Sequence, residues 1–449
     1  MNHLMSNIEG VNWPPVLTGP SAALAALLNH IEIAQWLLPE EIVKKQLEQL
    51  VALASHANRY SDLFRSRMQK AQLQPNDLDS LDRLRRLPLL TRRDIQTSGK
   101  SLFCKNVPKT HLPLQETSTS GSTGEPVMVY KTAITHLFWM AITTREQLWH
   151  QFDFSGRLFL IRANIREPVV QNDWGPPASV LFRTGLMQGI PSAMDIREQL
   201  KRILEFMPIG ICTYPNVLAG LLAQCEQSNV RIEGLKFIWT VGETLALPLR
   251  QKIESFFGAP VHDNYSSQEM GVIAVQCPVS RCYHVMSESL IVEVIDENGQ
   301  PCREGEVGQV VVTDLHNFVT PLIRYAIGDY AELGGACPCG RGLPALNRIV
   351  GRERNLLVKP DGSRSWPLTG FRKFRSIAPI LQYQFIQHTV HFIEVRLVTE
   401  RPLTATEEEM LRAPILEALG YPFTLSFTYF DEQLPLGKNG KFEEFLCRI

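Results

Sequence analysis

The stretch Thr117–Pro126 has the sequence TSTSGSTGEP, and a strand-like run, Val127–Lys131, follows it. From Thr117 to Gly124, six residues carry hydroxyl groups and two are glycines. Glycines allow backbone N–H groups to converge on an anion, and short hydroxyl side chains add donors without bulk. A Walker loop is excluded, because it needs a Gly-Lys-Ser/Thr sequence that opens a helix. Such a composition is usually that of a polar surface linker, and a phosphate-binding loop is the alternative that the glycines and hydroxyl groups allow.

The chain on either side of this loop predicts an α/β protein with two domains. Glu40–Ser55 has helical apolar spacing, and from Leu158 to Glu332 short β-rich runs alternate with helical stretches. The composition changes after Gly351, so we expect domains at 1–350 and 351–449. Further expected helices are a short one within Leu78–Thr91 that ends at Pro88, Ile196–Glu205, Val217–Gln227 and Thr406–Leu419. The expected strands are Leu158–Ile161, Ile209–Tyr214, Phe237–Val241, Pro260–His262, Ser289–Asp296, Gly308–Thr313, Val390–Val398 and Phe423–Phe430. Ser289–Asp296 and Gly308–Thr313 are expected to pair antiparallel around an Asn298-Gly299 turn.

Composition argues against several classes of protein. The net charge of −1 and the pI near 6.8 give no electrostatic reason to expect a nucleic-acid partner. The apolar run Ala22–Leu28 is too short to span a bilayer, and Met1–Gly10 is too polar for a secretory signal. Nine cysteines without export indicate reduced thiols. We therefore expect a cytoplasmic protein that neither inserts into membranes nor binds nucleic acid.

Asp263–Glu269, with the sequence DNYSSQE, combines an aromatic ring with a carboxylate. The ring of Tyr265 can stack on adenine, and the carboxylate of Glu269 can hold Mg2+ beside phosphates. Upstream, Val241-Gly242-Glu243-Thr244 ends a predicted strand in a polar turn. The alternative is an ordinary surface turn that happens to contain these two residues.

Two further segments offer one functional side chain each. Arg324–Asp329 has the sequence RYAIGD, and a carboxylate after a glycine turn can accept two hydrogen bonds from a ribose diol. Leu434–Phe442 contains the pair Gly440-Lys441. Such a lysine is ordinarily a solvated charge, and an ammonium that stabilises negative charge in a transition state is the alternative.

In their order along the chain, these segments resemble the motifs of adenylate-forming enzymes, and in particular the phenylacetate–coenzyme A ligase branch. The resemblance covers roughly Leu78 to the C-terminus. It implies a large N-terminal domain with mixed β-sheets flanked by helices, joined by a hinge near Arg352–Asn355 to a small, mobile C-terminal α+β domain. The implied ATP-binding residues are Thr119, Ser120, Gly121, Ser122, Thr123, Gly124, Gly242, Glu243, Tyr265, Ser266, Asp329 and Arg352, with Glu269 as the Mg2+ ligand and Lys441 as the catalytic lysine.

The same resemblance implies the reaction. A carboxylic acid, of an aromatic type, is activated by ATP as an acyl-adenylate and then forms a thioester with coenzyme A. Tyr214 and Trp239 are candidates for the acid pocket, although buried aromatic residues are more often plain core. One alternative is transfer of the acyl group to a carrier-protein thiol or another acceptor. A second alternative is an inactive, zinc-stabilised nucleotide-binding protein, favoured by three departures from the family pattern, Glu125, Ser266 and Asn355. A homodimer is one option for the oligomeric state.

Cysteine and histidine residues gather in two segments. Cys277, Cys282 and His284 lie within eight residues, and Cys337-Pro338-Cys339 follows about fifty residues later. Such pairs at two chain positions are typical of a structural, tetrahedral Zn2+ site, and unrelated reduced side chains are the alternative. The branch includes members with zinc ligands in these segments. By that resemblance Cys277, His284, Cys337 and Cys339 match best, which leaves Cys282 as a spare thiol.

Overall fold

The computed structural model describes residues 4–118, 127–352, 356–365, 374, 377–431, 434–435 and 445–449, with the backbone alone for residues 352, 364 and 365. The chain divides into two compact units, Met1–Val350 and Gly351–Ile449. The helices of the described residues include none with the length and apolar composition needed to cross a membrane.

The first unit begins with a group of helices. They are α1 (Gly19–Ala34), α2 (Pro39–Tyr60), α3 (Asp62–Lys70), α4 (Leu81–Arg85) and α5 (Arg92–Ser98). The predicted helix at Glu40–Ser55 is confirmed as the middle of α2, which begins with a proline where no N–H partner is needed. The short helix predicted within Leu78–Thr91 is confirmed as α4, which ends at Arg85, three residues before Pro88. Pro88 lacks an N–H and disfavours helical geometry in the preceding residue, so this segment contains only a short helix.

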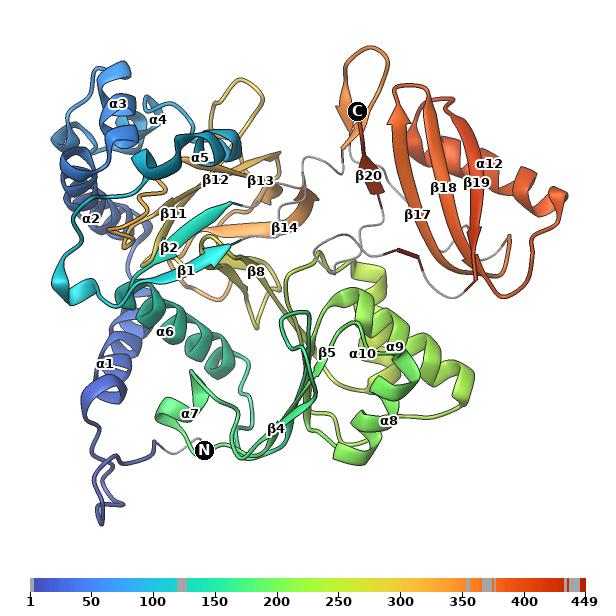
Figure 1. Cartoon of the computed structure of the whole chain (residues 1–449), viewed down its shortest axis with the longest axis horizontal. Helices are drawn as coiled ribbons and strands as arrows, with labels where there is room; N and C mark the ends of the chain where they lie inside the picture. Colours follow the sequence, from blue (N-terminus) through green and yellow to red (C-terminus); the bar gives the residue numbers. More distant parts are fainter. Residues whose placement is uncertain are drawn as a thin grey trace. The chain divides into compact units, whose positions relative to one another are not determined.

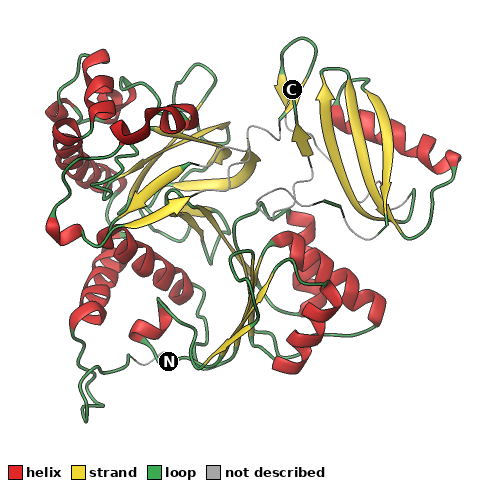
Figure 2. Cartoon of the chain, in the orientation of Figure 1, coloured by secondary structure: helices red, strands yellow, loops and turns green. Residues whose placement is uncertain are grey.

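A long mixed sheet forms the centre of the first unit (Figures 1 and 2). Its strands are β3 (Leu158–Arg162), β4 (Val169–Gln171), β5 (Met187–Pro191), β6 (Gly210–Thr213), β7 (Phe237–Thr240), β8 (Val261–Ser267), β9 (Gly271–Gln276), β10 (Tyr283–Val285), β11 (Leu290–Ile295), β12 (Val307–Asp314), β13 (Tyr325–Leu333) and β14 (Ala345–Arg352). Within the described residues the order is β11-β12-β13-β14-β10-β9-β8-β7-β6-β3-β5-β4. The run β5-β3-β6-β7-β8 is parallel, and β8 pairs with β9 antiparallel.

Helices cover the parallel part of the sheet, as the alternating pattern predicts. They are α6 (Ala133–Trp149), α7 (Ala178–Leu181), α8 (Ile196–Phe206), α9 (Pro215–Ser228) and α10 (Leu247–Phe257). Figure 1 shows α8, α9 and α10 side by side next to these strands. Their apolar residues, such as Ile203, Leu221 and Ile253, share one core with Ile211 and Ile238 of the sheet.

A separate hairpin flanks the proposed phosphate loop. Strands β1 (Gln115–Ser118) and β2 (Met128–Lys131) pair antiparallel, with Gln115 opposite Lys131 and Ser118 opposite Met128. The segments before and after the proposed loop, Gln115–Ser118 and Met128–Lys131, are therefore adjacent strands. The predicted strand at Val127–Lys131 is confirmed, beginning one residue later.

The second unit is a small α+β fold (Figure 2). Its elements are β15 (Leu357–Val358), β16 (Arg364–Ser365), β17 (Ile380–Thr389), β18 (Phe392–Thr399), α12 (Ala405–Leu419), β19 (Thr424–Phe430) and β20 (Phe445–Cys447). The main sheet has the order β19-β18-β17-β20. Leu411 and Ile415 of α12 share a core with Phe385 and Val395 of the sheet. Thr404 caps α12 by accepting a hydrogen bond from the Glu407 N–H at 3.2 Å.

The expected fold class, α/β with mixed sheet and flanking helices, is confirmed. One boundary matters for function. The strand predicted at Pro260–His262 is longer, because β8 continues to Ser267 and includes Tyr265. The predicted antiparallel pairing of Ser289–Asp296 with Gly308–Thr313 is confirmed as β11 and β12.

Candidate active site and metal centre

Several predicted site residues lie outside the described part of the chain. They are the loop residues Thr119, Ser120, Gly121, Ser122, Thr123 and Gly124, the hinge residue Asn355, and Lys441. Arg352 ends β14, and its side chain is not described. The roles of these residues stay predictions.

Tyr265 and Asp329 are brought together from segments far apart in the sequence. The Tyr265 hydroxyl donates a hydrogen bond to Asp329 Oδ2 at 2.7 Å. Both residues are 6% exposed. Tyr265 lies on β8, where the register with β9 shifts between Tyr265 and Ser266, and Asp329 lies on β13 directly after Gly328, whose φ is +84°. The pair therefore places an aromatic ring and a carboxylate within reach of one nucleoside.

Glu269 occupies the tight turn between β8 and β9. Ser267 Oγ closes this turn by accepting a hydrogen bond from the Met270 N–H at 3.0 Å. The side chain of Glu269 is 7% exposed, and its Oε1 lies 3.6 Å from Arg92 Nη1. A single buried carboxylate suits Mg2+, which usually binds one or two carboxylates together with substrate phosphates.

Two cations beside Glu269 were not predicted from the sequence. Arg92 begins α5, in a basic cluster that the sequence favours as a solvated helical face. Lys131 ends β2, and burial lowers the pKa of its ammonium, while the charges of Asp314 and Glu269 partly restore it. The position of Lys131 at the end of the phosphate-loop hairpin was the signal that could have identified it.

Gly242 and Glu243 follow β7 after one intervening residue, Val241. Gly242 has a φ of +73°, the left-handed region that favours glycine. Glu243 Oε2 accepts a hydrogen bond from the Asn216 N–H in the first turn of α9, at 3.1 Å. A carboxylate is favourable there because the N-terminus of a helix carries a partial positive charge. Glu243 thus links the end of β7 to α9.

The four predicted zinc ligands converge. One ligand atom each from Cys277, His284, Cys337 and Cys339 lies within 4.8 Å of all the others. The Cys277 and Cys337 sulfurs are 3.7 Å apart, and tetrahedral Zn–S bonds place two sulfurs about 3.8 Å apart. His284 Nε2 lies 3.2 Å from Cys339 Sγ, and His284 Nδ1 lies 3.3 Å from the Leu343 carbonyl. That second contact orients the ring as zinc-binding histidines usually are.

Cys282 lies beside this group without belonging to it. Its sulfur is 3.1 Å from Ser280 Oγ, and Ser280 Oγ is 3.0 Å from Cys337 Sγ. A serine hydroxyl therefore contacts both sulfurs. The arrangement agrees with the ligand set that the resemblance favoured.

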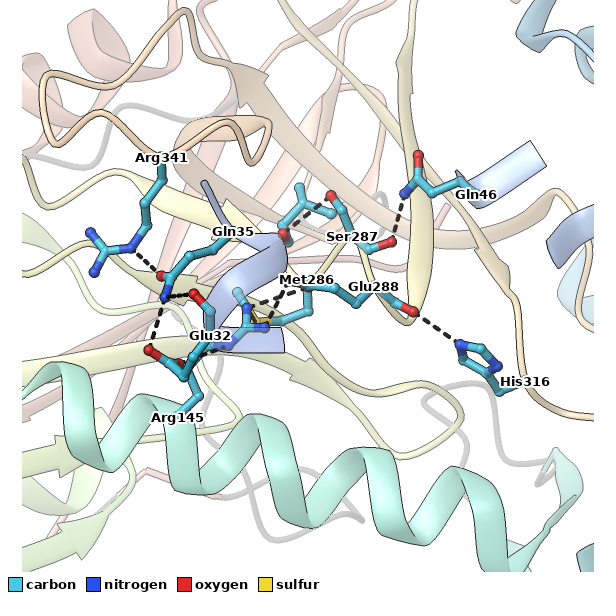
Figure 3. A network of polar contacts seen from close by, with 10 residues as sticks. Glu32, Gln35, Gln46, Arg145, Met286, Ser287, Glu288, His316 and Arg341 are labelled. Carbon is cyan, nitrogen blue, oxygen red and sulfur yellow. Dashed lines mark hydrogen bonds and ion pairs between the residues drawn. The ribbon is translucent and has the colours of Figure 1, made fainter. Parts of the chain in front are cut away.

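A buried polar network connects the cysteine segment with the helices (Figure 3). Arg341, two residues after Cys339, donates from Nε to Gln35 Oε1 at 2.6 Å, and Gln35 Nε2 donates to Glu32 Oε2 at 2.8 Å. Glu32 and Glu288 both pair with Arg145 of α6, whose side chain is 0% exposed. Breaking such a buried pair leaves an uncompensated charge, so the network fixes α1 and α6 against the cysteine segment.

The chain is similar to several known acid–coenzyme A ligases. The phenylacetate-coenzyme A ligase of Thermus thermophilus is 25% identical over 342 residues, which cover 72% of this chain and 73% of the relative. That of Pseudomonas putida is 25% identical over 358 residues, covering 74% and 75%. The solved structure of 2-hydroxyisobutyryl-CoA ligase in complex with 2-HIB-AMP superposes with a TM-score of 0.73 at 20% identity, covering 92% and 91%. No protein-family model matches the chain.

Over about three quarters of its length, the chain is thus similar to phenylacetate-coenzyme A ligases. The resemblance read from the motifs is thereby confirmed. Because the solved structure is only 20% identical, it supports the fold and leaves the site residues to be tested.

Both aromatic candidates for the acid pocket make polar contacts. The Tyr214 hydroxyl accepts a hydrogen bond from the Ala163 N–H at 3.1 Å, and the Arg162 guanidinium lies 5.5 Å from the ring centroid. The Trp239 indole N–H donates to Glu146 Oε1 at 2.8 Å. Both side chains also pack against the apolar core around α9. They therefore combine core packing with polar contacts that a purely apolar core residue would not make.

Glu146 is the unexpected member of this region. It lies on α6 at 0% exposure, and Asn264 Nδ2 donates to its two oxygens at 3.1 and 3.0 Å. Burial raises the pKa of Glu146 to about 8, against the opposing effect of the hydrogen bonds from Asn264 and Trp239. Nothing in the local sequence distinguishes this glutamate from a surface residue of an amphipathic helix.

The raised pKa of Glu146 predicts how stability depends on pH. Because the folded protein binds this proton more tightly, the stabilisation is complete below the unfolded pKa and is lost as pH rises through about 8. Burial lowers the pKa of His150 to about 3 and of His262 to about 4. These two histidines make the free energy of unfolding rise with pH, but only up to about pH 6.5, the pKa of histidine in the unfolded chain. Between about pH 6.5 and 8 we therefore expect the free energy of unfolding to fall with rising pH, by at most about 1.4 kcal/mol per unit.

Urea unfolding at several pH values checks this expectation. Glu146→Gln removes the titrating group and should flatten the slope in that pH range. An unchanged slope in the variant would show that Glu146 does not carry the effect.

Proposed function

We propose that this protein is an AMP-forming acid–coenzyme A ligase that activates an aromatic carboxylic acid. The observation that carries the proposal is the Tyr265–Asp329 hydrogen bond at 2.7 Å, with Glu269 in the turn after β8. It supports one binding site for the adenosine and phosphate parts of ATP. The relatives that are phenylacetate-coenzyme A ligases support the acid class and the thiol.

In the first step, a carboxylate oxygen of the acid attacks the α-phosphorus of ATP, and pyrophosphate leaves. Tyr265 contacts the adenine and Asp329 accepts hydrogen bonds from the ribose hydroxyls. Mg2+ at Glu269 would neutralise phosphate charge. Arg92 and Lys131, which lie beside Glu269, supply further positive charge toward the leaving pyrophosphate.

In the second step, the thiolate of coenzyme A attacks the adenylate carbonyl and AMP leaves. Lys441 of the second unit acts in the first step only, where its ammonium offsets the negative charge on the α-phosphate. Movement of residues 351–449 about a hinge near Arg352–Asn355 would then remove this lysine before the thiol enters.

Zn2+ at Cys277, His284, Cys337 and Cys339 is part of the proposal as a structural ion. A shell of three thiolates and one imidazole is complete, so it offers no open position for a substrate or water. Its effect would be to hold the two cysteine segments together beside α1. Cytoplasmic location, a carrier-protein acceptor and a homodimer stay predictions from the sequence.

Product analysis tests the choice of acceptor. The protein is incubated with ATP, Mg2+, phenylacetate and coenzyme A, and the products are identified by mass spectrometry. We expect AMP and phenylacetyl-coenzyme A in equal amounts. An acyl-adenylate that accumulates and is not consumed by coenzyme A would instead favour a carrier-protein thiol or another acceptor.

A further inference from the structure

An ion pair occupies the place at which Glu269 would hold Mg2+. Arg92 Nη1 lies 3.6 Å from Glu269 Oε1, and the two side chains are 26% and 7% exposed. Salt screens partly buried charges much less than exposed ones, so the charge of Arg92 acts on any ion that binds Glu269. The proposed metal ligand is thus already paired with a cation in the free protein.

The backbone that carries Arg92 is fixed against strand β13. The Leu90 N–H donates to the Arg324 carbonyl at 2.8 Å, and the Leu90 carbonyl accepts from the Ala326 N–H at 2.9 Å. One residue further on, the Thr91 side chain caps the first turn of α5. A ligand at this site can therefore redirect the Arg92 side chain without moving the segment that holds it.

Lys131 is the second cation near Glu269, and Asp314 is a second acid. Burial lowers the pKa of Lys131, and the charges of Asp314 and Glu269 oppose this effect. Burial also raises the pKa of Asp314, to about 6, so that this carboxylate is mostly ionised at neutral pH. The charges of Arg92 and Lys131 therefore balance those of the two acids before any ligand binds. Mg2+ alone would leave excess positive charge here, which the phosphates of ATP would offset.

A metal ion on Glu269 would be repelled by Arg92 in its present position. Mg2+ binds carboxylate oxygens at about 2.0 to 2.1 Å. An ion on Glu269 Oε1 would then lie no more than about 5.7 Å from Arg92 Nη1, given the 3.6 Å between the two side chains. Like charges at that distance repel strongly where water is partly excluded. The guanidinium is instead suited to phosphate oxygens, to which it donates two parallel hydrogen bonds.

We infer that Arg92 neutralises Glu269 in the nucleotide-free protein and moves to the β- and γ-phosphates of ATP when Mg2+ binds Glu269, so that metal and nucleotide bind cooperatively. This inference rests on the proposed function and adds a catalytic residue to it, because the phosphates that Arg92 contacts leave as pyrophosphate. The effect has a definite sign: Arg92 opposes binding of the metal alone and favours binding of the metal with ATP. An arginine that only supported the fold would, when removed, lower the affinity for both.

Binding of Mn2+, a paramagnetic substitute for Mg2+, tests this inference. Free Mn2+ is measured by electron paramagnetic resonance with the full-length protein and no nucleotide, and the binding that Glu269→Gln removes is assigned to this site. We expect Arg92→Met to bind Mn2+ about 10-fold more tightly than the wild-type protein, within the usual range of coupling between two sites. With Mn2+ present, the variant's Kd for α,β-methylene-ATP, which cannot release pyrophosphate, should rise about 10-fold.

Two control variants separate charge from fold. Arg92→Lys keeps the positive charge and should bind Mn2+ alone as weakly as the wild-type protein does. Arg93→Met removes the neighbouring, exposed arginine of α5 and should leave both affinities unchanged. Equal affinity for Mn2+ alone in the wild-type protein and Arg92→Met, or weaker binding in the variant, would overturn the inference.

These binding measurements do not depend on acid activation. Absence of acid-dependent exchange, in a protein whose Mn2+ affinity changes with Arg92 as expected, would overturn the proposed function and leave the coupling of metal and nucleotide intact. Mn2+ binding that Glu269→Gln leaves unchanged, with and without nucleotide, would overturn the proposed metal ligand and this inference with it.

Discussion

Replacing Lys441 by alanine is expected to slow acid-dependent pyrophosphate exchange about 100- to 1,000-fold, the usual cost of removing one group that stabilises transition-state charge. Attack of a carboxylate on the α-phosphate brings two anions together, and the ammonium of Lys441 would offset that charge. The measurement is the exchange rate at saturating ATP and acid. Because the loss is specific to the transition state, kcat should fall much more than the KM for ATP rises.

Lys438→Ala is the control for this variant. Lys438 lies three residues before Lys441 in the same segment and carries the same charge, but it precedes the Gly440-Lys441 pair. Its loss should change the exchange rate less than about 3-fold, as for a solvated charge. Thioester formation from acyl-adenylate supplied in the assay should survive in Lys441→Ala. Equal losses in the two lysine variants would contradict the assignment.

Replacing Cys337 by serine is expected to remove the bound metal and to destabilise the first unit. The four ligand atoms lie within 4.8 Å of one another, so the site is formed by the fold itself. At free Zn2+ of about 1,000 times the Kd, an ion that binds only the folded protein adds about 4 kcal/mol of stability. Protein purified without a metal-affinity tag should contain about one zinc per chain, and the variant close to none, with a lower Tm.

Cys282→Ser provides the matched control for the metal site. Its thiol is in the same turn and contacts Ser280 Oγ, but it is not among the four converging ligands. The zinc content should therefore stay near that of the wild-type protein. Loss of zinc in Cys282→Ser, with retention in Cys337→Ser, would show that Cys282 is the ligand.

The order of several short motifs along the chain predicted more of the site than any single motif did alone. Asp263–Glu269 and Arg324–Asp329 were singled out separately, and the structure joins them through Tyr265 and Asp329. The cysteine spacing likewise predicted the group that converges at Cys277 and Cys339. These predictions succeeded because few structural roles require cysteine and histidine pairs, or an aromatic residue followed closely by a carboxylate, at such spacings.

Contacts between distant segments were missed because a sequence window does not contain them. Arg92 looks like a solvated helical residue, yet the sheet brings Glu269 to it. Glu146 likewise fits the polar side of a helix, yet α6 buries it against β7 and β8. In both cases the topology decides the environment, and α5 or α6 alone does not reveal it.

Strand β17 was missed for a different reason. Gln384 and Gln387 are buried in it, so its apolar pattern is interrupted at core positions. Gln387 compensates by accepting from the Val358 N–H at 2.9 Å and donating to the Val358 carbonyl at 2.6 Å. When a buried glutamine side chain forms hydrogen bonds with backbone groups, a core strand contains polar residues and looks like a surface segment in the sequence.

Acid-dependent exchange of labelled pyrophosphate into ATP by the wild-type protein tests directly whether the protein forms an acyl-adenylate. A panel of aryl and alkyl acids is supplied with ATP and Mg2+, without coenzyme A, and label in ATP is measured with and without each acid. We expect exchange that requires an acid and is fastest with aryl acids. No exchange with any acid, in a protein that still binds ATP, would contradict it and leave an inactive nucleotide-binding protein.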